Sequence, residues 1–273
     1  MEEGLLSRMT GAWHLASLAA LTAAGMLAGC ASTDTGASEP WDPIEVPNRF
    51  VFSINRAVDL IAIRPFAVLY RDWMPTPAQK GVTNLLDNLG EPVTAINEVI
   101  QGAPGRAGIT MARFLVNSTI GLVGIFDVAS SLGLKKTQED MGKTIGLYAG
   151  AEPENGGFFL MLPIVGPSNA RDATGLLLDL AMDPFQIATI ATYAGATHDA
   201  LVAASYARYG ARLLDARSRT LFALDDLEKN SVDYYAALKS AYTQHRAEAI
   251  REKREATGSR GELDRRDKLS LVR

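Results

Sequence analysis

Residues 76–102 read TPAQKGVTNLLDNLGEPVTAINEVIQG and predict two short amphipathic helices in direct succession. Thr76 can cap the first helix and Pro77 can open it, because proline is tolerated in the first helical turn. Apolar side chains spaced by three or four residues form one side of this helix: Val82, Leu85, Leu86 and Leu89. Asn84 and Asn88 lie one turn apart on the opposite side. The helix therefore has one apolar and one polar surface.

The same pattern continues on either side of this stretch. Glu91-Pro92 can start the second helix, which Gly102 can end, with Val93, Ile96 and Ile100 as its apolar residues. Residues 48–63 predict another helix, with an apolar stripe of Phe50, Ile54, Val58 and Ile61 and a polar side of Asn48, Asn55 and Asp59. From Asp42 to about Gln244 there is no long alternating strand pattern and no fixed repeat. We therefore predict an all-α fold built from amphipathic helices.

Three charge-free runs add more apolar surface than one modest soluble core requires: residues 114–126, 156–166 and 184–197. Each is shorter than the ~18 residues that a spanning helix needs. Glycine or proline interrupts each run, with Gly121 and Gly124 in the first. These two glycines either make that segment flexible or permit close packing. The composition of these runs indicates a chain that is half-immersed in a membrane.

A long helix is expected from Arg217 to about Ala256, and the chain beyond Gln244 becomes strongly charged. Residues 245–273 contain nine Lys or Arg and six Asp or Glu, with almost no apolar residues. We expect this segment to be a charged, disordered tail. A solvated, fraying end and a basic contact with anionic lipid or another protein are the two alternatives.

The amino end has the features of a secretory signal, assigned to residues 1–29. Residues 15–27 are 13 uncharged residues, which would rise about 20 Å as a helix. That is too short for a ~30 Å hydrocarbon core but fits the hydrophobic region of a signal peptide. Arg8 precedes the run, although Glu2 and Glu3 offset its charge, so translation from Met1 or from Met9 stays open.

The only cysteine of the chain, Cys30, ends the sequence Leu27-Ala-Gly-Cys, which resembles the bacterial lipoprotein box. We expect cleavage before Cys30 and its acylation; an incidental thiol is the alternative. Several acyl chains, at about 0.8 kcal/mol per buried methylene, anchor a protein stably, whereas one chain does not. Ala31 follows the cysteine in place of the aspartate that retains lipoproteins in the inner membrane. Residues 30–41 are small and polar and predict a flexible tether.

Composition and missing motifs exclude several classes of function. Twenty-seven Lys or Arg against 31 Asp or Glu give a net charge of −4, so no basic field exists for nucleic acid. One cysteine excludes a disulfide framework and a multi-thiolate metal site, and three histidines leave little material for a histidine-based metal centre, so we expect no metal and no cofactor. The sequence has no nucleophile elbow, no zinc-protease motif and no phosphate loop, so we predict no catalytic residues. His198 and His245 are interpreted as surface bystanders, and Asp225-Asp226 as a solvated face.

A series of short motifs runs from Asp42 to about Arg246. The first motifs are Asp42-Pro43, Asn48-Arg49-Phe50, Asn55, Arg64-Pro65, Tyr70, Pro75-Thr-Pro77, Asn84, Asn88-Leu89, Glu91-Pro92, Asn97 and Gln101-Gly102. The later ones are Arg113-Phe114, Asn117-Ser118, Gly121 to Asp127, Leu162-Pro163, Gly166-Pro167-Ser168, Arg171-Asp172 and Tyr234-Tyr235 to Gln244. In this order the motifs resemble the MlaA (VacJ) family of outer-membrane lipoproteins. We accordingly assign residues 42–244 to one family domain. The acidic segment 150–157 departs from the glycine-rich family pattern, so its role stays open.

The resemblance implies a ring of amphipathic helices within the inner leaflet of the outer membrane, on its periplasmic side, that encloses a central channel. Family members remove mislocalised phospholipids from the outer leaflet, lie beside porin trimers and pass lipid to a soluble periplasmic carrier. Such a channel needs polar walls for the headgroup, and helices satisfy their own backbone polar groups in lipid. An envelope scaffold that binds porins without conducting lipid is the alternative function, and a lipid-hydrolysing enzyme is a third.

In this picture eight polar residues are candidates for the channel wall or for headgroup contact: Asn48, Arg49, Asn55, Asn84, Asn88, Asn97, Arg113 and Asn117. For the amides, helix capping or interhelical bonding is the alternative. For Arg49, Arg64, Arg113 and Arg171, contact with phosphate competes with a fold-holding ion pair to a residue such as Asp172 or Glu91. A structural hairpin is expected from Leu162, Pro163, Gly166, Pro167, Arg171 and Asp172.

Overall fold

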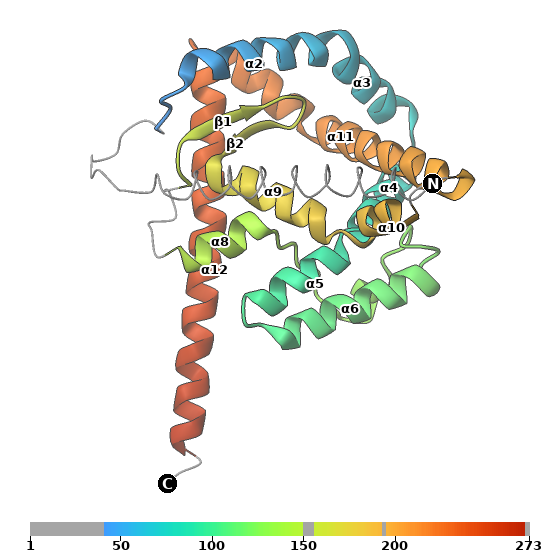
Figure 1. Cartoon of the computed structure of the whole chain (residues 1–273), viewed down its shortest axis with the longest axis vertical. Coiled ribbons are helices and arrows are strands. Elements are labelled where there is room, and N and C mark those ends of the chain that lie inside the picture. Colours follow the sequence, from blue (N-terminus) through green and yellow to red (C-terminus); the bar gives the residue numbers. More distant parts are fainter. Residues whose placement is uncertain (1–40, 150–155, 193–194, 271–273) are drawn as a thin grey trace, which may run out of the picture.

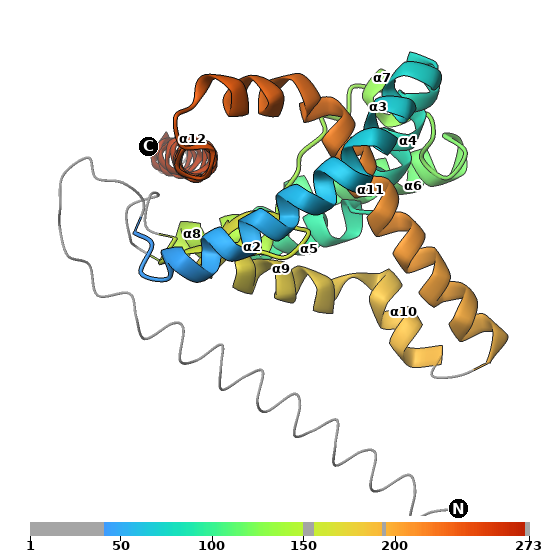
Figure 2. The same cartoon turned by 90° about the horizontal axis from the view of Figure 1, so that it is seen from above.

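The computed structural model describes residues 41–149, 156–192 and 195–270, with side chains described as far as residue 257. The described helices are arranged as a ring, and a long carboxy-terminal helix runs along one side and projects beyond it (Figures 1 and 2). The first half comprises α2 Glu45–Val58, the π-helix η1 Asp59–Ile63, α3 Arg64–Trp73, α4 Thr76–Asn88, α5 Glu91–Ile100, α6 Pro104–Thr119 and α7 Val128–Ser131. The second half comprises α8 Met141–Tyr148, β1 Phe159–Leu162, β2 Gly166–Asn169, α9 Ala170–Met182, α10 Pro184–Thr192, α11 Ala196–Asn230 and α12 Tyr234–Ser270.

The two helices predicted from residues 76–102 are present as α4 and α5. Pro77, Pro92 and Pro104 each lie in the first turn of their helices, where a missing N–H removes no helical hydrogen bond. The helix expected over residues 48–63 is longer, since α2, η1 and α3 are continuous from Glu45 to Trp73. The π turn directly precedes Arg64-Pro65, so the irregular turn accommodates a proline within a helical rod.

A two-stranded antiparallel hairpin is the sheet found in the described residues. Phe159 pairs with Asn169, and Leu162 pairs with Gly166. The hairpin packs against α2 and α12, where Phe159, Met161 and Tyr235 form the centre of a small apolar core. This core is the only buried cluster of large apolar side chains that joins both chain ends within the described part.

The long helix expected from Arg217 to Ala256 is wrong, because the chain breaks between α11 and α12. Residues 231–233 are not helical, and Asp233 accepts a hydrogen bond from the backbone N–H of Ala236. Ser231 and Asp233 both favour helix ends, because their side chains compete for backbone groups. Helix α11 accordingly begins earlier, at Ala196, and α12 starts a new direction.

The disorder expected from residue 245 onward is also wrong for the part with described side chains. Helix α12 continues through His245, and Ala247, Ile250 and Lys253 are buried. Ile250 lies against α8, where a Cβ added to Gly146 would come within 2.8 Å of it. The polar composition of α12 gives no indication of this contact, because only one narrow stripe of the helix is buried. The leader, Cys30, all of the tether except Trp41, and residues 150–155 of the acidic segment lie outside the described residues.

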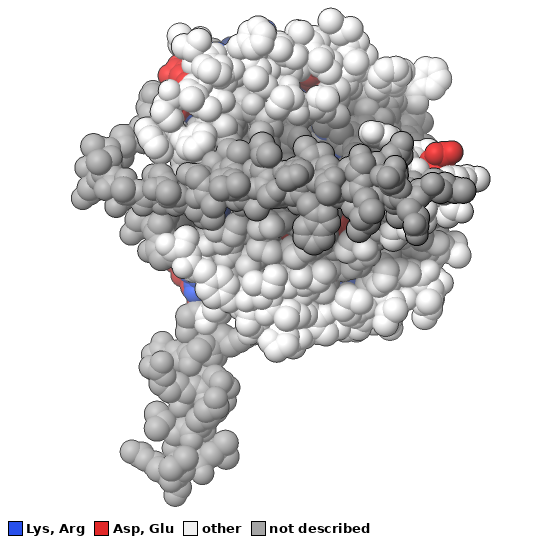
Figure 3. All heavy atoms as spheres, viewed as in Figure 1, with Lys and Arg blue, Asp and Glu red and all other residues white. Residues whose placement is uncertain are grey.

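In the described part of the chain, charged and amide side chains are buried while many large apolar side chains are exposed. We call this distribution inverted polarity, because soluble proteins show the reverse. The largest fully buried side chains in this part include Arg113, Glu98 and Asn97, whereas large apolar side chains such as Trp73, Ile190 and Phe222 are more than 70% exposed. On the face seen in Figure 3, charged side chains appear at only a few places, mostly near the margin. Among the described helices, none combines the length and the apolar character required to cross a bilayer.

Candidate functional site

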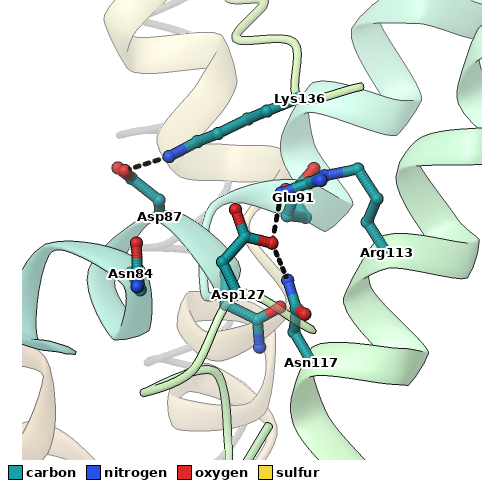
Figure 4. Close-up of a pocket in the computed structure, with 8 residues that line it drawn as sticks. Asn84, Asp87, Glu91, Arg113, Asn117, Asp127 and Lys136 are labelled. Atoms are coloured by element: carbon teal, nitrogen blue, oxygen red, sulfur yellow. Dashed lines mark hydrogen bonds and ion pairs between the residues drawn. The ribbon is translucent and has the colours of Figure 1, made fainter. Parts of the chain in front are cut away.

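A small polar cavity lies among α4, α5, α6 and the segment that follows α6. It is lined by Asn84, Asp87, Asn88, Glu91, Arg113, Asn117, Asp127 and Lys136. Figure 4 shows these side chains converging from the separate helices. Four of the eight residues predicted for the channel wall thus meet in one place. The cavity volume is about 10 Å³, which is room for one water molecule and not for a lipid headgroup.

Arg113 is the centre of this cluster and is only 1% exposed. Its Nε lies 3.1 Å from Oε1 of Glu91, and its Nη2 lies 3.1 Å from Oδ1 of Asp127. Nη1 donates to the carbonyl oxygen of Leu134 at 2.6 Å and to Ser130 Oγ at 3.1 Å. These contacts fix the guanidinium among α5, α6 and α7, and the structure matches the fold-holding alternative for this arginine.

The two carboxylates that face Arg113 have opposite pKa shifts. Burial raises the pKa of Asp127, but hydrogen bonds from Ser130 and Asn117 and the charge of Arg113 outweigh it and leave the pKa at about 2. Burial also raises the pKa of Glu91, and there the contact with Arg113 offsets burial only in part. Asn117 donates to Asp127 at 3.1 Å and accepts from the backbone N–H of Ala129 at 2.9 Å. Asn117 therefore joins α6 to α7.

Asn84 and Asn88 hold the segment that connects α6 to α7. Asn84 donates to the carbonyl oxygen of Ile125 at 3.2 Å, and Asn88 donates to the carbonyl oxygen of Val123 at 3.4 Å and to Ser118 Oγ on α6 at 2.9 Å. In this segment Leu122 and Val123 have φ values of 51° and 61°, which is a strained conformation for such residues.

Close packing accounts for both glycines of this segment. A Cβ at Gly121 would lie 2.3 Å from the carbonyl oxygen of Phe126, and one at Gly124 would lie 2.5 Å from Cβ of Asn88. Of the two interpretations of these glycines, the structure supports close packing.

Asn48 and Asn55 bind the hairpin in the way that a neighbouring strand would. Asn48 donates to the carbonyl oxygen of Phe159 and accepts from the N–H of Met161, both at 2.9 Å. Asn55, two helical turns later on α2, donates to the carbonyl of Leu162 and accepts from the N–H of Ile164, both at 2.8 Å. The free edge of β1 is therefore closed by side-chain amides.

The residues expected to shape the hairpin lie in and directly after it. Leu162 and Gly166 flank its turn, Pro163 follows β1, and Pro167 lies within β2. Gly166 has a φ of 94°, which glycine adopts without strain. Arg171 and Asp172 lie beyond the hairpin, in the first turn of α9, and their side chains pair at 2.9 Å.

Asn97 lies apart from the polar cavity and is fully buried among α5, α8 and α9. It donates to Asp179 at 2.9 Å and accepts from Thr144 Oγ1 at 2.8 Å. Asp179 also accepts from the N–H of Met141, but burial dominates and raises the pKa of its carboxyl. Asn97 therefore connects three helices.

A row of ion pairs joins α2, η1 and α3 to α11 and the start of α12, and we call it the polar seam. Arg49 pairs with Asp233 at 2.6 Å, Arg64 with Asp225 at 2.7 Å, and Arg217 with Asp59 at 2.8 Å; Arg56 also pairs with Glu228. The hydrogen bonds from Arg49 and Arg64 lower the pKa of Asp233 and of Asp225 respectively. Asp225 is thus ion-paired in the seam, which the interpretation as a solvated face did not include, although its side chain is still 38% exposed.

Sequence reasoning missed a second charged cluster, in which α12 is tied to α8 and α9. Arg246 contacts Asp140 at 2.5 Å and Asp172 at 2.8 Å, and Tyr242 donates to Asp172 at 2.5 Å. Burial raises the pKa of Asp172, but hydrogen bonds from Arg246 and Arg171 outweigh it and lower the pKa overall. The only signal in the sequence was the polar side of α12, which composition alone could not distinguish from a solvated surface.

The eight predicted channel residues all make hydrogen bonds to the protein. Five of them are buried, namely Asn48, Asn88, Asn97, Arg113 and Asn117. For these five, the structure shows bonds between segments and no open wall. Arg49 is exposed and Asn55 and Asn84 are partly exposed, so contact with a headgroup stays a prediction for these three. Within the described ranges, no three His, Cys, Asp or Glu side chains gather as metal ligands.

Comparison with known proteins gives consistent results. The sequence model of the family described as MlaA lipoprotein matches residues 40–249. The chain is 32% identical to the intermembrane phospholipid transport system lipoprotein MlaA of Haemophilus influenzae, over 84% of this chain and 87% of the relative. The protein of that name from Escherichia coli K12 is 31% identical, over 80% and 82%. An uncharacterised protein of Rickettsia bellii is 32% identical, over 80% of each chain.

A solved structure described as the structural basis for maintenance of bacterial outer membrane lipid asymmetry has a similar fold. The TM-score is 0.59 at 30% identity, and the match covers 77% of this chain and 98% of the solved chain. The similarity therefore extends over nearly the whole length of that protein.

Proposed function

Because the chain belongs to the MlaA lipoprotein family, we propose that it removes mislocalised phospholipids from the outer leaflet of the outer membrane and delivers them toward the periplasm. The proposal is supported by relatives named as lipoproteins of an intermembrane phospholipid transport system. It is also supported by the similar solved structure, which is connected with outer-membrane lipid asymmetry.

The inverted polarity of the described residues carries this proposal. Soluble monomers seldom expose many large apolar side chains together, and they seldom bury arginine and glutamate among hydrogen bonds. Here exposed apolar residues occur on α2, α3, α6, α9, α10 and α11. A ring of helices whose outer surfaces lie in lipid explains this distribution, because each helix satisfies its own backbone polar groups.

The polar seam is suited to form the wall of a path along which a lipid headgroup moves. A phospholipid in transit needs polar surroundings for its headgroup, but tight binding would trap it. Arg49, Arg64 and Arg217 are each matched by a carboxylate, so a passing phosphate meets charges that are already compensated. We propose that movement along this path is passive and that its direction comes from partner proteins or from the lipid gradient.

The proposal extends to the location and partners of the protein. Acylation of Cys30 would anchor the chain on the periplasmic side of the outer membrane, with the ring partly embedded in the inner leaflet. A porin trimer beside the ring and a soluble periplasmic phospholipid carrier are the proposed protein partners. We propose no enzymatic step: incubation of the purified protein with labelled phospholipid should release no free fatty acid.

A deletion strain tests the function directly. An amine-reactive reagent that does not cross the outer membrane should label more phosphatidylethanolamine in the deletion strain than in the parent. Expression of the full chain should restore the parental level, and expression of Cys30→Ser should restore it less well. Parental surface lipid and an intact permeability barrier in the deletion strain would contradict the proposal.

A scaffold that binds porins without conducting lipid is separated from a conduit by reconstitution. A bulky substitution at Asn88 or Asn97 does not serve, because these side chains are 2% and 0% exposed and the change would disturb folding. Purified full-length protein is instead placed in liposomes with a fluorescent phospholipid in one leaflet. A conduit accelerates the loss of leaflet asymmetry relative to liposomes with an unrelated lipoprotein, whereas a scaffold leaves the rate unchanged.

A further inference from the structure

A second cavity lies near the amino-terminal end of α6, against the segment that leads to α8. It is lined by Arg106, Ile109, Thr110, Gly133, Leu134, Lys135 and Thr137. Its volume is about 400 Å³, which is within the range of small-molecule sites in proteins. None of these residues belongs to the polar cavity or to the polar seam.

The charges of this cavity are both positive, and neither is matched by a carboxylate within the part of the chain that is described. Nε of Arg106 is buried and has no hydrogen-bond partner there. The Lys135 ammonium is exposed and pairs with no described side chain, whereas its neighbour Lys136 pairs with Asp87 at 2.5 Å. A buried N–H without a partner costs free energy, so its occurrence beside a cavity indicates a ligand.

The two nearby carboxylates, Glu98 and Glu139, make their hydrogen bonds and ion pairs with groups other than Arg106 and Lys135. Glu98 is fully buried and accepts from Thr110 Oγ1 at 2.6 Å and from Thr137 Oγ1 at 2.8 Å. Glu139 forms an ion pair with Lys253. The hydroxyls of Thr110 and Thr137 thus turn toward Glu98, which leaves Arg106 and Lys135 as the groups that a ligand in the cavity would meet.

The rest of the lining is apolar. Ile109 on α6 is 42% exposed, and Leu134 is partly exposed on the facing segment. A ligand that suits this cavity therefore carries a negative group for the guanidinium and the ammonium, together with an apolar part for the two aliphatic side chains. A phosphate is the negative group that an arginine fork binds well, and an anionic phospholipid joins it to an apolar part.

We propose that this cavity binds the phosphate of an anionic phospholipid, with Arg106 and Lys135 on the phosphate and with Ile109 and Leu134 against the start of the acyl chains. The inference rests on the proposed function only in assuming that the chain meets phospholipid. It adds a preference for anionic over zwitterionic headgroups at a site outside the ion-paired seam.

Calorimetric titration of the full chain in detergent, with short-chain soluble probes, tests the inference. Dihexanoyl phosphatidylglycerol should bind at least about tenfold more tightly than dihexanoyl phosphatidylcholine, inorganic phosphate or uncharged dihexanoylglycerol. Inorganic phosphate binding as tightly as the lipid would assign the cavity to free phosphate. Equal binding of dihexanoylglycerol would show an apolar pocket only. Either result, or no binding of phosphatidylglycerol, overturns the proposal.

Substitution of the two cationic residues tests whether the lipid binds at Arg106 and Lys135. Arg106→Gln with Lys135→Gln should weaken phosphatidylglycerol binding about tenfold or more. The control Lys80→Gln removes an exposed lysine on α4 and should leave binding unchanged. Should the double variant fail to fold, Lys135→Gln alone, at an exposed position, should still weaken binding about threefold. Wild-type affinity in a folded double variant, or in Lys135→Gln where that alone folds, would overturn the assignment.

The outcome can be separated from that of the proposed function. If the variants bind as wild type while the deletion strain still gathers surface phospholipid, the anionic site is wrong and the transport function stands. If the deletion strain is normal while the cavity binds phosphatidylglycerol through Arg106 and Lys135, the site stands and the transport function is wrong.

Discussion

Arg246 on α12 forms an ion pair with Asp172 on α9, with 2.8 Å between Nε and Oδ2, although 74 residues separate them in the sequence. The same guanidinium contacts Asp140 at the start of α8 at 2.5 Å. Burial alone would lower the pKa of Arg246, but the hydrogen bonds to both carboxylates outweigh it and raise the pKa. This one side chain therefore fixes the carboxy-terminal helix to two helices of the ring.

We expect Arg246→Gln to lower the free energy of unfolding by about 3 kcal/mol, because removing the guanidinium leaves the buried carboxylate of Asp172 and the partly exposed one of Asp140 with less compensation. The matched control on the same helix is Arg251→Gln. Arg251 pairs with Glu248 at an exposed position, where such pairs contribute less than about 1 kcal/mol. Urea unfolding in detergent, followed by circular dichroism, measures both. Equal effects of the two substitutions would show that the Arg246 cluster is not a tie between helices.

Gly175→Ala should destabilise the chain by several kcal/mol. A Cβ at Gly175 would lie 2.3 Å from the backbone nitrogen of Gly142, so α8 and α9 would have to separate. Gly108→Ala is the control, because no atom lies within 4 Å of its added Cβ, and alanine favours the helix by up to about 1 kcal/mol. The two substitutions should thus shift the unfolding midpoint in opposite directions. A shift in the same direction would contradict the close approach of α8 and α9.

Local pattern was enough to predict the helices of residues 76–102, and it could not reveal what their polar sides contact. The apolar spacing and the proline positions act within one helix, so they specify α4 and α5 without information from elsewhere. The partners of Asn48 and Asn55 lie more than 100 residues away in the hairpin. An amide on a helix has the same periodicity whether it faces a lipid headgroup or another segment.

Local sequence pattern also explains why the predictions for residues 217–256 were wrong, since it carries no information about distant partners. Asp225 and Asp226 are neighbours on one helix and do not face each other, which predicts a solvated face, yet Asp225 forms an ion pair with Arg64 in the polar seam. The break at residues 231–233 carries a sequence signal in Ser231 and Asp233, but the apolar spacing on both sides obscured it.

Because of Asp127, the free energy of unfolding of the protein should depend measurably on pH in the acid range. The pKa of Asp127 is about 2 in the folded protein against an ordinary value of 3.8. The ionised form is therefore favoured by folding, and this stabilisation is complete above about pH 4 and is lost as the pH falls through the folded value. The shift corresponds to about 2 kcal/mol.

The comparison that checks this is between the wild-type chain and Asp127→Asn, by thermal unfolding from pH 6 to pH 2. Their difference in stability should shrink as the pH falls, whereas Asp226→Asn, at an exposed position on α11, should track the wild type throughout. Because Glu91 has a raised pKa and acts in the opposite sense, the difference between variants is the relevant quantity. A constant difference down to pH 2 would show that Asp127 is not held in its ionised form.

The exposed apolar side chains should hold the ring in a membrane even without the proposed lipid anchor. Cys30→Ser should still sediment with vesicles of phosphatidylethanolamine and phosphatidylglycerol. Adding Leu177→Ser, Ile190→Ser and Phe222→Ser to that chain should weaken binding at least tenfold, since these side chains are each at least 66% exposed and each contributes about 1 kcal/mol or more in lipid. Substituting the exposed Lys80 and Lys229 by serine instead should leave sedimentation unchanged, because neither removes apolar surface. Complete release of Cys30→Ser into the supernatant, with native circular dichroism, would mean that these apolar faces are covered by something other than lipid, and the embedded ring would have to be abandoned.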